Sequence, residues 1–265
     1  MHPLALNLFK NILAFTLLIP TIYIAGETLF RDAPAHDYIL LLISGFLGIG
    51  IGDTLFFKSL NLLGAGLSSI VACMYSPFII ILSVIFLGDK LTAYQIIGIL
   101  MILSAVLTAT GNNGRHPLSR RDLWLGILFG ALANASTAVG VVIIKPLLTN
   151  SPLLWATEMR LFSGMVTVAI GLWFHPARQK ITQPLMNSRQ WFYTFSGSFA
   201  GAYLSMIIWL AGMKFTQASI AAALNQTSNI YVFIFATFLL HEPVNLRRIV
   251  GILLGVGGAI LVTFG

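Results

Sequence analysis

The chain has 265 residues, of which 57% are hydrophobic and only 9% are charged, and its mean hydropathy is +0.90. Soluble domains carry about a quarter charged residues, because their core needs a polar surface around it. This composition excludes a soluble globular domain, a disordered chain and a disulfide-rich scaffold, and it indicates a protein of the lipid bilayer. The net charge of +7 does not indicate a nucleic-acid partner, since no stretch forms a solvated basic face.

Nine runs of roughly 20 apolar residues are long enough to cross a hydrocarbon core of about 30 Å as helices. In chain order they cover residues 3–25, 38–57, 66–87, 92–110, 122–144, 152–174, 190–210, 218–240 and 245–264. The segments between them are short and rich in turn-forming residues. We therefore expect an all-α polytopic membrane protein with nine transmembrane helices.

A repeat with a period of about 150 residues runs through the chain. Residues 65–100, AGLSSIVACMYSPFIIILSVIFLGDKLTAYQIIGIL, align without gaps with residues 218–253, ASIAAALNQTSNIYVFIFATFLLHEPVNLRRIVGIL. Gly98 falls on Gly251, and PLALNLFK near the N-terminus matches SPLLWATEMR in the second half. The repeat predicts two homologous parts.

The predicted repeats cover residues 1–111 and 122–265, with a linker at 112–121. The second repeat begins with a helix at 122–144 that has no counterpart in the first. The first repeat therefore has four predicted spans and the second has five. An odd number of spans inverts the second copy of a repeat relative to the first. A five-plus-five arrangement would therefore have the inverted pseudo-symmetry that is common among secondary transporters.

The sequence resembles the drug/metabolite transporter superfamily, EamA type, in three features. They are this two-repeat layout, the shared spacing from a proline to a cation, and the LGDKL and LHEPV turns. The resemblance covers the whole chain, and it implies ten helices in two inverted repeats that move small metabolites. We expect that fold without its first helix. Either the native chain starts upstream of Met1, or this is a nine-helix variant whose open side is closed by lipid or a partner. The oligomeric state therefore stays open, with a homodimer as one option.

Four charged residues lie beyond the first turn of a predicted helix, and such a group inside a membrane costs roughly 2.5 to 3.5 kcal/mol on insertion scales. Lys10 and Arg160 occupy equivalent repeat positions, Glu158 precedes Arg160 by two residues, and Asp53 follows GIGIG near the end of its span. We assign them to cavity charge or proton coupling. The alternative is that Lys10 and Arg160 anchor helix ends, and that Asp53 is an interfacial carboxylate near Lys10 or Lys58.

Uncharged polar residues near mid-span are candidates for substrate binding, because they are costly unless they face water or polar groups. The candidates are Asn225, Gln226, Ser228 and Asn229 in the penultimate helix, Tyr75 and Ser76 at the aligned position of the first repeat, and Asn134 and Thr137. Hydrogen bonding between helices is the alternative for each of them.

We expect structural roles for the two acidic residues in the predicted turns. Asp89 and Glu242 are aligned by the repeat, and we expect them to cap helix starts or to bond loop amides. The five histidines are scattered singly, and the chain has no phosphate-binding loop. No metal and no cofactor are therefore expected.

These features favour a secondary transporter that moves a small metabolite or drug by alternating access, with proton-coupled efflux as one mode. The alternatives are a membrane-embedded enzyme acting on a lipid-linked substrate, and a channel. An enzyme would need an H-E-x-x-H, a G-x-S-x-G or clustered carboxylates, and a channel would need a charged ring; the sequence contains none of these. The predicted location is the inner membrane of a bacterial or archaeal cell. Most loop cations favour an external C-terminus, whereas the resemblance implies a cytoplasmic one.

Overall fold

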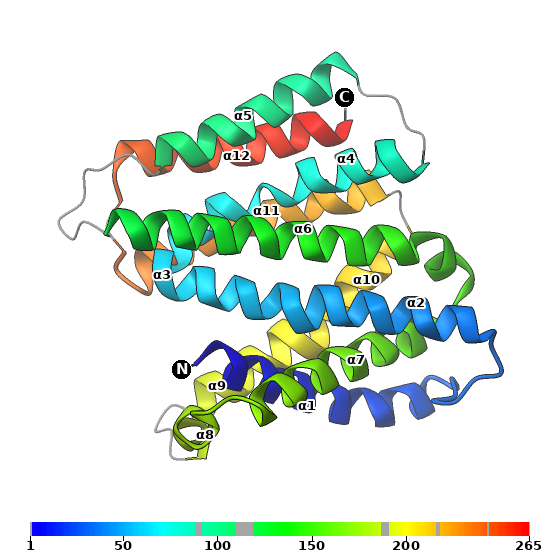
Figure 1. The fold of residues 1–265 in the computed structure, drawn as a ribbon. Helices are drawn as coiled ribbons and strands as arrows, with labels where there is room; N and C mark the ends of the chain where they lie inside the picture. Colours follow the sequence, from blue (N-terminus) through cyan, green and yellow to red (C-terminus); the bar gives the residue numbers. More distant parts are fainter. Residues whose placement is uncertain are drawn as a thin grey trace. The chain divides into compact units, whose positions relative to one another are not determined.

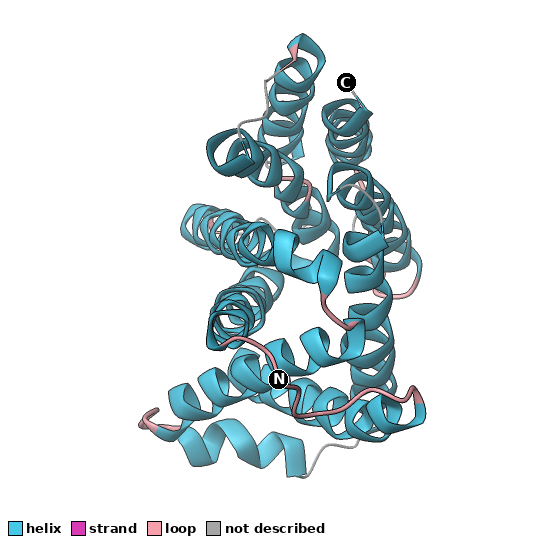
Figure 2. Ribbon diagram, turned by 90° about the vertical axis from the view of Figure 1, so that its right-hand side faces the viewer, coloured by secondary structure: helices cyan, strands magenta, loops and turns pink. Residues whose placement is uncertain are grey.

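A computed structural model describes residues 2–87, 92–109, 119–186, 191–215, 218–242 and 244–264. Over these ranges, the regular secondary structure is helical throughout (Figure 1 and Figure 2). In chain order, the helices are α1 (Pro3–Ile24), α2 (Ala35–Gly45), the π-helix η1 (Phe46–Gly52), α3 (Asp53–Ala72), α4 (Tyr75–Leu87), α5 (Ala93–Ala109), α6 (Arg120–Asn150), α7 (Leu153–Trp173), α8 (Arg178–Met186), α9 (Trp191–Ser198), the π-helix η2 (Phe199–Leu204), α10 (Ser205–Phe215), α11 (Ala218–Phe238) and α12 (Leu246–Phe264).

The apolar runs of the sequence coincide with these helices, which confirms the all-α membrane fold. In lipid, a helix satisfies its backbone hydrogen bonds internally, so long apolar segments adopt it. Among the described residues, five continuous helical stretches are long and apolar enough to cross a membrane. They are Pro3–Ile24, Ala35–Ala72, Arg120–Asn150, Leu153–Trp173 and Trp191–Phe215, and shorter apolar helices accompany them.

Helix boundaries differ from the prediction where turn-like sequences continue a helix. Lys58 lies inside α3 rather than in a loop, and the kink of this helix comes later, at Gly64, whose φ of 78° suits glycine. Helix α6 runs through Pro146 to its end at Asn150. Its apolar flanks favour helix, and membrane helices tolerate an internal proline. The predicted connector after α7 contains the short helix α8.

The predicted span at 66–87 is interrupted in the structure. Helix α3 ends at Ala72 and α4 begins at Tyr75. Pro77 is in the first turn of α4, where its missing amide hydrogen breaks no helical bond. The break therefore lies inside a segment whose composition resembles a single apolar helix.

The helices form two compact units, and the first contains Met1–Thr54 and Val139–Thr216. In this unit, α7 packs against α1, α2 and η1, while α1 also packs against η2. The π-helices η1 and η2 begin one repeat period apart. The helix that carries Lys10 in the first repeat and the helix that carries Arg160 in the second thus each pack against the π-helix of the other repeat. A two-fold relation between the repeats produces such reciprocal packing.

The second unit contains Leu55–Ala138 and Gln217–Gly265. Its closest helix pair is α5 and α12, which lie side by side in Figure 1. A Cβ on Gly98 would lie 2.6 Å from the carbonyl oxygen of Gly258, and one on Gly251 would lie 3.2 Å from that of Ala105. These two contacts exchange under the repeat alignment and require antiparallel helices. They fit a local two-fold axis perpendicular to the helices, which is the axis of an inverted repeat.

Candidate functional site

The first unit contains a buried ion pair. The Nζ atom of Lys10 lies 2.6 Å from Oδ2 of Asp53, and it also donates to Oδ1 of Asn11 at 3.2 Å. The Lys10 side chain is 11% exposed and that of Asp53 is 30% exposed. Of the two neighbours considered from the sequence, Asp53 thus pairs with Lys10. In the second unit, Lys58 lies over the ring of Phe129 at 5.5 Å from its centroid.

Two asparagines extend this ion pair to η1. Asn11 Nδ2 donates to Oδ1 of Asn7 at 3.0 Å, and Asn7 Nδ2 donates to the carbonyl oxygen of Ile49 at 3.0 Å and to Oγ1 of Thr54 at 2.9 Å. Both asparagines are fully buried. A π-helix departs from the regular α-helical hydrogen-bond register, and here the amide of Asn7 satisfies one of its carbonyls.

Sequence reasoning identified Lys10 but missed Asn7 and Asn11. Asn7 and Asn11 are spaced i, i+4 on α1, and Lys10 lies three residues after Asn7. A helix brings such residues onto one face. The signal was therefore present as a polar stripe on an otherwise apolar helix. We name this set, with Asp53 and Thr54, the α1 network.

The second repeat places Arg160 at the position equivalent to Lys10. Arg160 is 1% exposed, and its guanidinium carbon lies 5.3 Å from the ring centroid of Trp209 on α10. The backbone of Arg160 is in direct contact with Gly45, where a side chain would not fit. The Arg160 cation is thus held against an aromatic ring, a favourable contact in a desolvated site.

Glu158 is completely buried on the same helix. Within the part of the chain that the structure describes, neither carboxylate oxygen has a hydrogen-bond partner, and Glu158 forms no ion pair. The two-residue spacing turns Glu158 and Arg160 roughly 200° apart around the helix. Of the four predicted charged residues, the structure thus pairs Lys10 with Asp53 and leaves Glu158 unpaired.

Hydrogen bonds to backbone groups fix the ends of three helices in this unit. Oε2 of Glu27 accepts from the amide of Trp155 in the first turn of α7, at 3.0 Å. Lys214 donates to the carbonyl of Ser151 at 2.5 Å, and Lys145 donates to the carbonyl of Met213. Lysines favour helix C-termini because carbonyl groups are unsatisfied there. These cations have a structural role that the sequence did not reveal.

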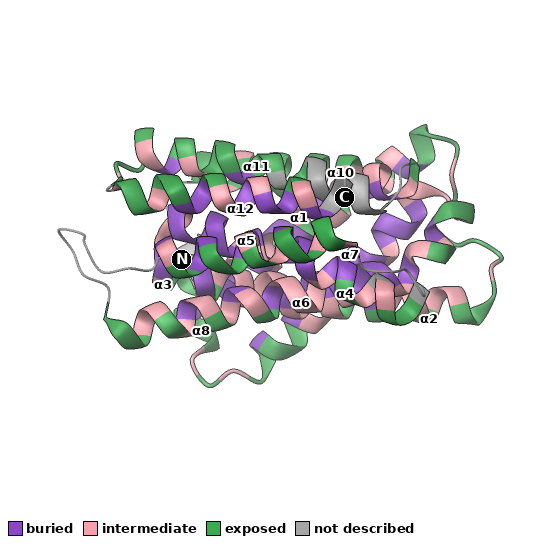
Figure 3. Cartoon of the chain, turned by 90° about the horizontal axis from the view of Figure 1, so that it is seen from above, coloured by how far each residue is buried: buried purple, intermediate pink, exposed green. Residues whose placement is uncertain are grey.

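In the second unit, the predicted substrate residues of α11 lie in different surroundings. Asn225 and Ser228 are exposed, and Ser228 donates to the carbonyl of Asn225 at 2.6 Å. Asn229 is 9% exposed, and its Nδ2 lies 3.6 Å from Sγ of Cys73. Exposed residues recur along this helix (Figure 3). The side chain of Gln226 lies outside the described residues.

The other predicted contacts gather at the break between α3 and α4. Tyr75 and Ser76 are buried there, and Asn134 Nδ2 donates to the carbonyls of Val71 at 3.3 Å and Gly130 at 2.8 Å. Thr137, one turn along α6, is half-buried. The structure thus brings Asn229 of α11 and Asn134 of α6 to the same interruption, since Asn229 contacts Cys73 and Asn134 contacts Val71. We name this region the α3–α4 break.

Glu242 caps a helix start, one of the two roles predicted for it, because it accepts from two amides of α3 where this helix restarts after its kink. Its Oε1 accepts from the amide of Ala65 at 2.7 Å and its Oε2 from that of Gly66 at 3.0 Å. The carboxylate thus anchors the chain directly after the kink at Gly64. Asp89, its repeat equivalent, lies outside the described residues.

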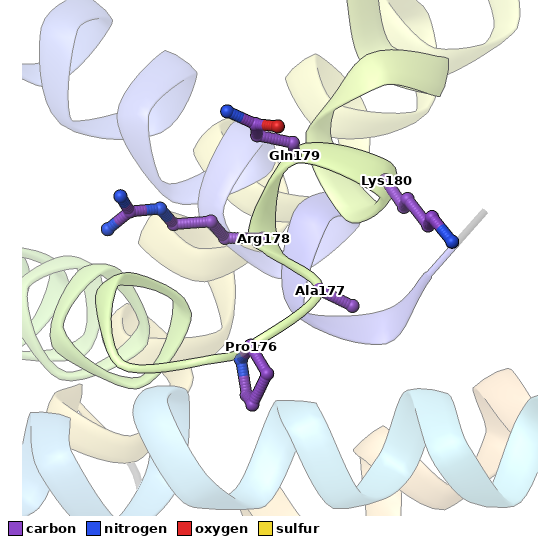
Figure 4. A pocket seen from close by; sticks show the side chains of 5 residues that line it. All are labelled: Pro176, Ala177, Arg178, Gln179 and Lys180. Carbon is purple, nitrogen blue, oxygen red and sulfur yellow. The ribbon is translucent and has the colours of Figure 1, made fainter.

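A hollow of about 490 Å³ lies where α7 turns into α8 and is lined by Pro176, Ala177, Arg178, Gln179 and Lys180. The three polar side chains point in different directions (Figure 4). Arg178 lies 5.3 Å from the ring centroid of Trp173. The hollow therefore offers no converging groups for a substrate. The described residues also contain no group of three or more potential metal ligands.

Comparison with known proteins identifies the family. The model of the EamA-like transporter family matches this chain twice, over residues 1–111 and 124–264. The chain belongs to the EamA-like transporter family. It is therefore an integral, multi-pass membrane protein, and family membership indicates a transporter rather than a membrane enzyme.

Relatives agree with this family, and a solved structure agrees with the fold. An uncharacterized transporter of Archaeoglobus fulgidus is 22% identical over 92% of this chain and 85% of its own length. The uncharacterized transporter YvbV of Bacillus subtilis is 25% identical over 84% of this chain and 71% of its own. One crystal structure matches with a TM-score of 0.73 at 16% identity, covering 99% of this chain and 88% of that one. The structural match supports the fold alone.

Proposed function

We propose that the protein is a proton-coupled secondary carrier that exports a small polar metabolite or drug by alternating access. The observation that carries this proposal is the reciprocal packing of the first unit, where α1 lies against η2 and α7 lies against η1. Carriers built from inverted repeats alternate by exchanging the conformations of the two copies. Contacts that swap between repeats are the elements such an exchange would use.

The buried charges support coupling to an ion gradient. Asp53, Lys10, Glu158 and Arg160 lie in helices of an integral membrane protein, and all but Asp53 are buried. Ionisable residues within membrane helices are costly, and they often mark ion pathways or proton relays. Two of these four are acids that can bind a proton. We assign the coupling function to this group.

For the substrate, we propose binding by the polar residues at the α3–α4 break and on α11. Exposed Asn225 and Ser228 offer amide and hydroxyl groups, and Tyr75, Ser76, Asn134 and Thr137 are further candidates. Neutral donors and acceptors of this kind select polar, hydrogen-bonding solutes. Amino acids, nucleosides and sugars fit this chemistry.

Reconstituted vesicles test the proposal. Vesicles containing the purified protein are loaded with unlabelled amino acids, nucleosides or sugars, and uptake of the labelled compound is followed. Alternating access predicts that internal substrate accelerates uptake, and proton coupling predicts accumulation under an imposed pH gradient. Uptake that is linear with concentration and insensitive to internal substrate would indicate a channel. Saturable exchange that ignores pH would contradict the coupling.

A further inference from the structure

Glu158 differs from Lys10 and Arg160 because, among the described residues, no side chain or backbone group forms a polar contact with its carboxylate. It is 0% exposed, and both carboxylate oxygens lack a hydrogen-bond partner among the described residues. Leu154 and Leu161, four residues before it and three after it, belong to the apolar cluster with Leu18 and Ile22 of α1. Residues at these spacings share a helix face. The carboxyl group of Glu158 therefore lies on the apolar side of α7.

The titratable groups on the elements packed against α7 all have other partners or point away. On α1, Lys10 pairs with Asp53 and Tyr23 is 63% exposed. On α2, His36 and Asp37 pair with each other, and the hydroxyl of Tyr38 donates to the carbonyl of Arg31. On α10, Lys214 donates to the carbonyl of Ser151. Tyr203 of η2 bonds Thr21, and Glu27 in the loop after α1 bonds the amide of Trp155. On α7 itself, Arg160 lies over Trp209. No described cation forms an ion pair with Glu158.

We infer that Glu158 is the proton-binding residue of the carrier, and that the Lys10–Asp53 pair is a permanent structural bond. This inference rests on the proposed function. An ionised carboxylate without partners is far more costly to bury than the neutral acid. In the conformation described here, Glu158 therefore holds its proton. Asp53 needs none, because Lys10 already neutralises it at 2.6 Å.

Release of the proton then requires another conformation. The ionised carboxylate of Glu158 becomes stable only where water or a cation reaches it, which the present packing of α7 on α1 prevents. The bound proton therefore favours the present state, and its loss favours a state in which α7 is open to water. A ligand shifts a conformational equilibrium through such a difference in affinity. The proton gradient would drive the carrier through this single side chain.

Infrared spectroscopy of the purified protein at neutral pH tests protonation without any substrate. The carbonyl stretch of a protonated carboxyl group is separate from the bands of ionised carboxylates. We expect this band in the wild type, its loss in Glu158→Gln and its retention in Asp53→Asn. Asp32→Asn, which removes an exposed acid, is the control and should leave the band unchanged. A band that survives in Glu158→Gln, or a wild type without one, would overturn the inference.

Transport in vesicles provides the second measurement, with the membrane potential clamped and labelled amino acids, nucleosides or sugars as probes. With one proton per substrate, a gradient of one pH unit supports about tenfold accumulation. In Glu158→Gln we expect no accumulation but continued exchange across the membrane. Accumulation that persists in this variant contradicts the inference, whereas a wild type that neither exchanges nor accumulates any probe contradicts the proposed function itself. If Glu158→Gln does not fold, Glu158→Asp serves instead, because its shorter acid should keep coupling and shift the infrared band.

Discussion

Lys10 and Arg160 lie at equivalent positions of the two repeats, and both are buried, but they meet different surroundings. Lys10 belongs to the α1 network, in which every side chain has a hydrogen-bond partner within 3.2 Å. Arg160 faces an aromatic ring, and the neighbouring Glu158 has no described partner. The first repeat has thus used its buried polar groups to fix η1. The second repeat instead contains the buried acid that we propose as the proton-binding residue.

This contrast separates two roles that sequence patterns cannot separate. Buried polar networks that are fully satisfied rigidify a structure. A buried acid without a partner adds no such rigidity and is costly to bury, so it is a candidate for a functional role. We therefore propose a structural role for the Lys10–Asp53 pair and a functional one for Glu158. The following variants test this comparison.

The largest effect on stability is expected from Asp53→Leu. The substitution leaves Lys10 as a buried cation without its carboxylate, and breaking a buried pair in this way costs about 3 kcal/mol. We expect a clear fall in Tm for the protein in detergent. Changing Lys10 to Met in the same chain should recover part of the loss, because no unpaired charge remains. Equal Tm values for wild type and Asp53→Leu would show that the α1 network is not structural.

Glu242→Ala tests the acids in the turns. The amides of Ala65 and Gly66 lose their acceptor, and we expect a loss of about 2 kcal/mol, since each unsatisfied buried donor costs roughly 1 to 3 kcal/mol. Folded yield and Tm measure the effect, and Glu242→Gln should be intermediate because it keeps one acceptor oxygen. If the repeats are equivalent here, Asp89→Ala will lower the yield similarly. If Asp89→Ala leaves folded yield and Tm unchanged, only the acid of the second repeat anchors the chain in this way.

The glycines of the α5–α12 contact should show a smaller, graded effect. A Cβ on Gly98 would lie 2.6 Å from the carbonyl oxygen of Gly258, whereas one on Gly251 has 3.2 Å to that of Ala105. Gly98→Ala should therefore cost about 1 to 2 kcal/mol and Gly251→Ala less, as expected for overpacking. Gly171→Ala is the control, since its Cβ would meet nothing within 4 Å. Equal changes in Tm for all three variants would contradict the close packing of α5 against α12.

Much of this fold follows from local sequence. The helices follow from apolar runs of sufficient length, and the repeat follows from the alignment of residues 65–100 with 218–253. The anchoring role of Glu242 follows from its place in a turn. These features depend on composition and spacing, which a chain displays directly.

Other features depend on partners far away in the chain. Asn7 donates to the carbonyl of Ile49, which lies 42 residues away, and Lys145 donates to Met213, 68 residues away. The π-helices η1 and η2 differ from α-helices only in their hydrogen bonds, so the apolar pattern does not distinguish them. The same pattern also does not show that Glu158 is unpaired while Lys10 is paired. These distinctions require the tertiary structure.

The smallest effect on stability, and a large one on transport, is expected at Asn225 of α11. Its repeat equivalent is Ala72, so the amide group is specific to the second repeat. Asn225 is exposed, and an average hydrogen bond between membrane helices is worth only about 0.6 kcal/mol. Asn225→Leu should therefore leave Tm nearly unchanged. If the amide binds substrate, its loss should weaken affinity by roughly 5- to 150-fold, because substrate polar groups stay unpaired.

Asn229→Leu provides the contrast on the same helix, because Asn229 is buried and its amide lies 3.6 Å from Sγ of Cys73. We expect a lower Tm for this variant, and we expect transport to fall further than folded yield only if its amide also reaches substrate. Thr237→Val is the control, since that hydroxyl bonds the carbonyl of Phe233 in its own helix. The exchange rate divided by folded yield, together with the substrate affinity from the same assays, decides between the roles. If both asparagine variants transport normally, the amides only pack helices together, and the substrate site is then to be sought around Tyr75 and Asn134 at the α3–α4 break.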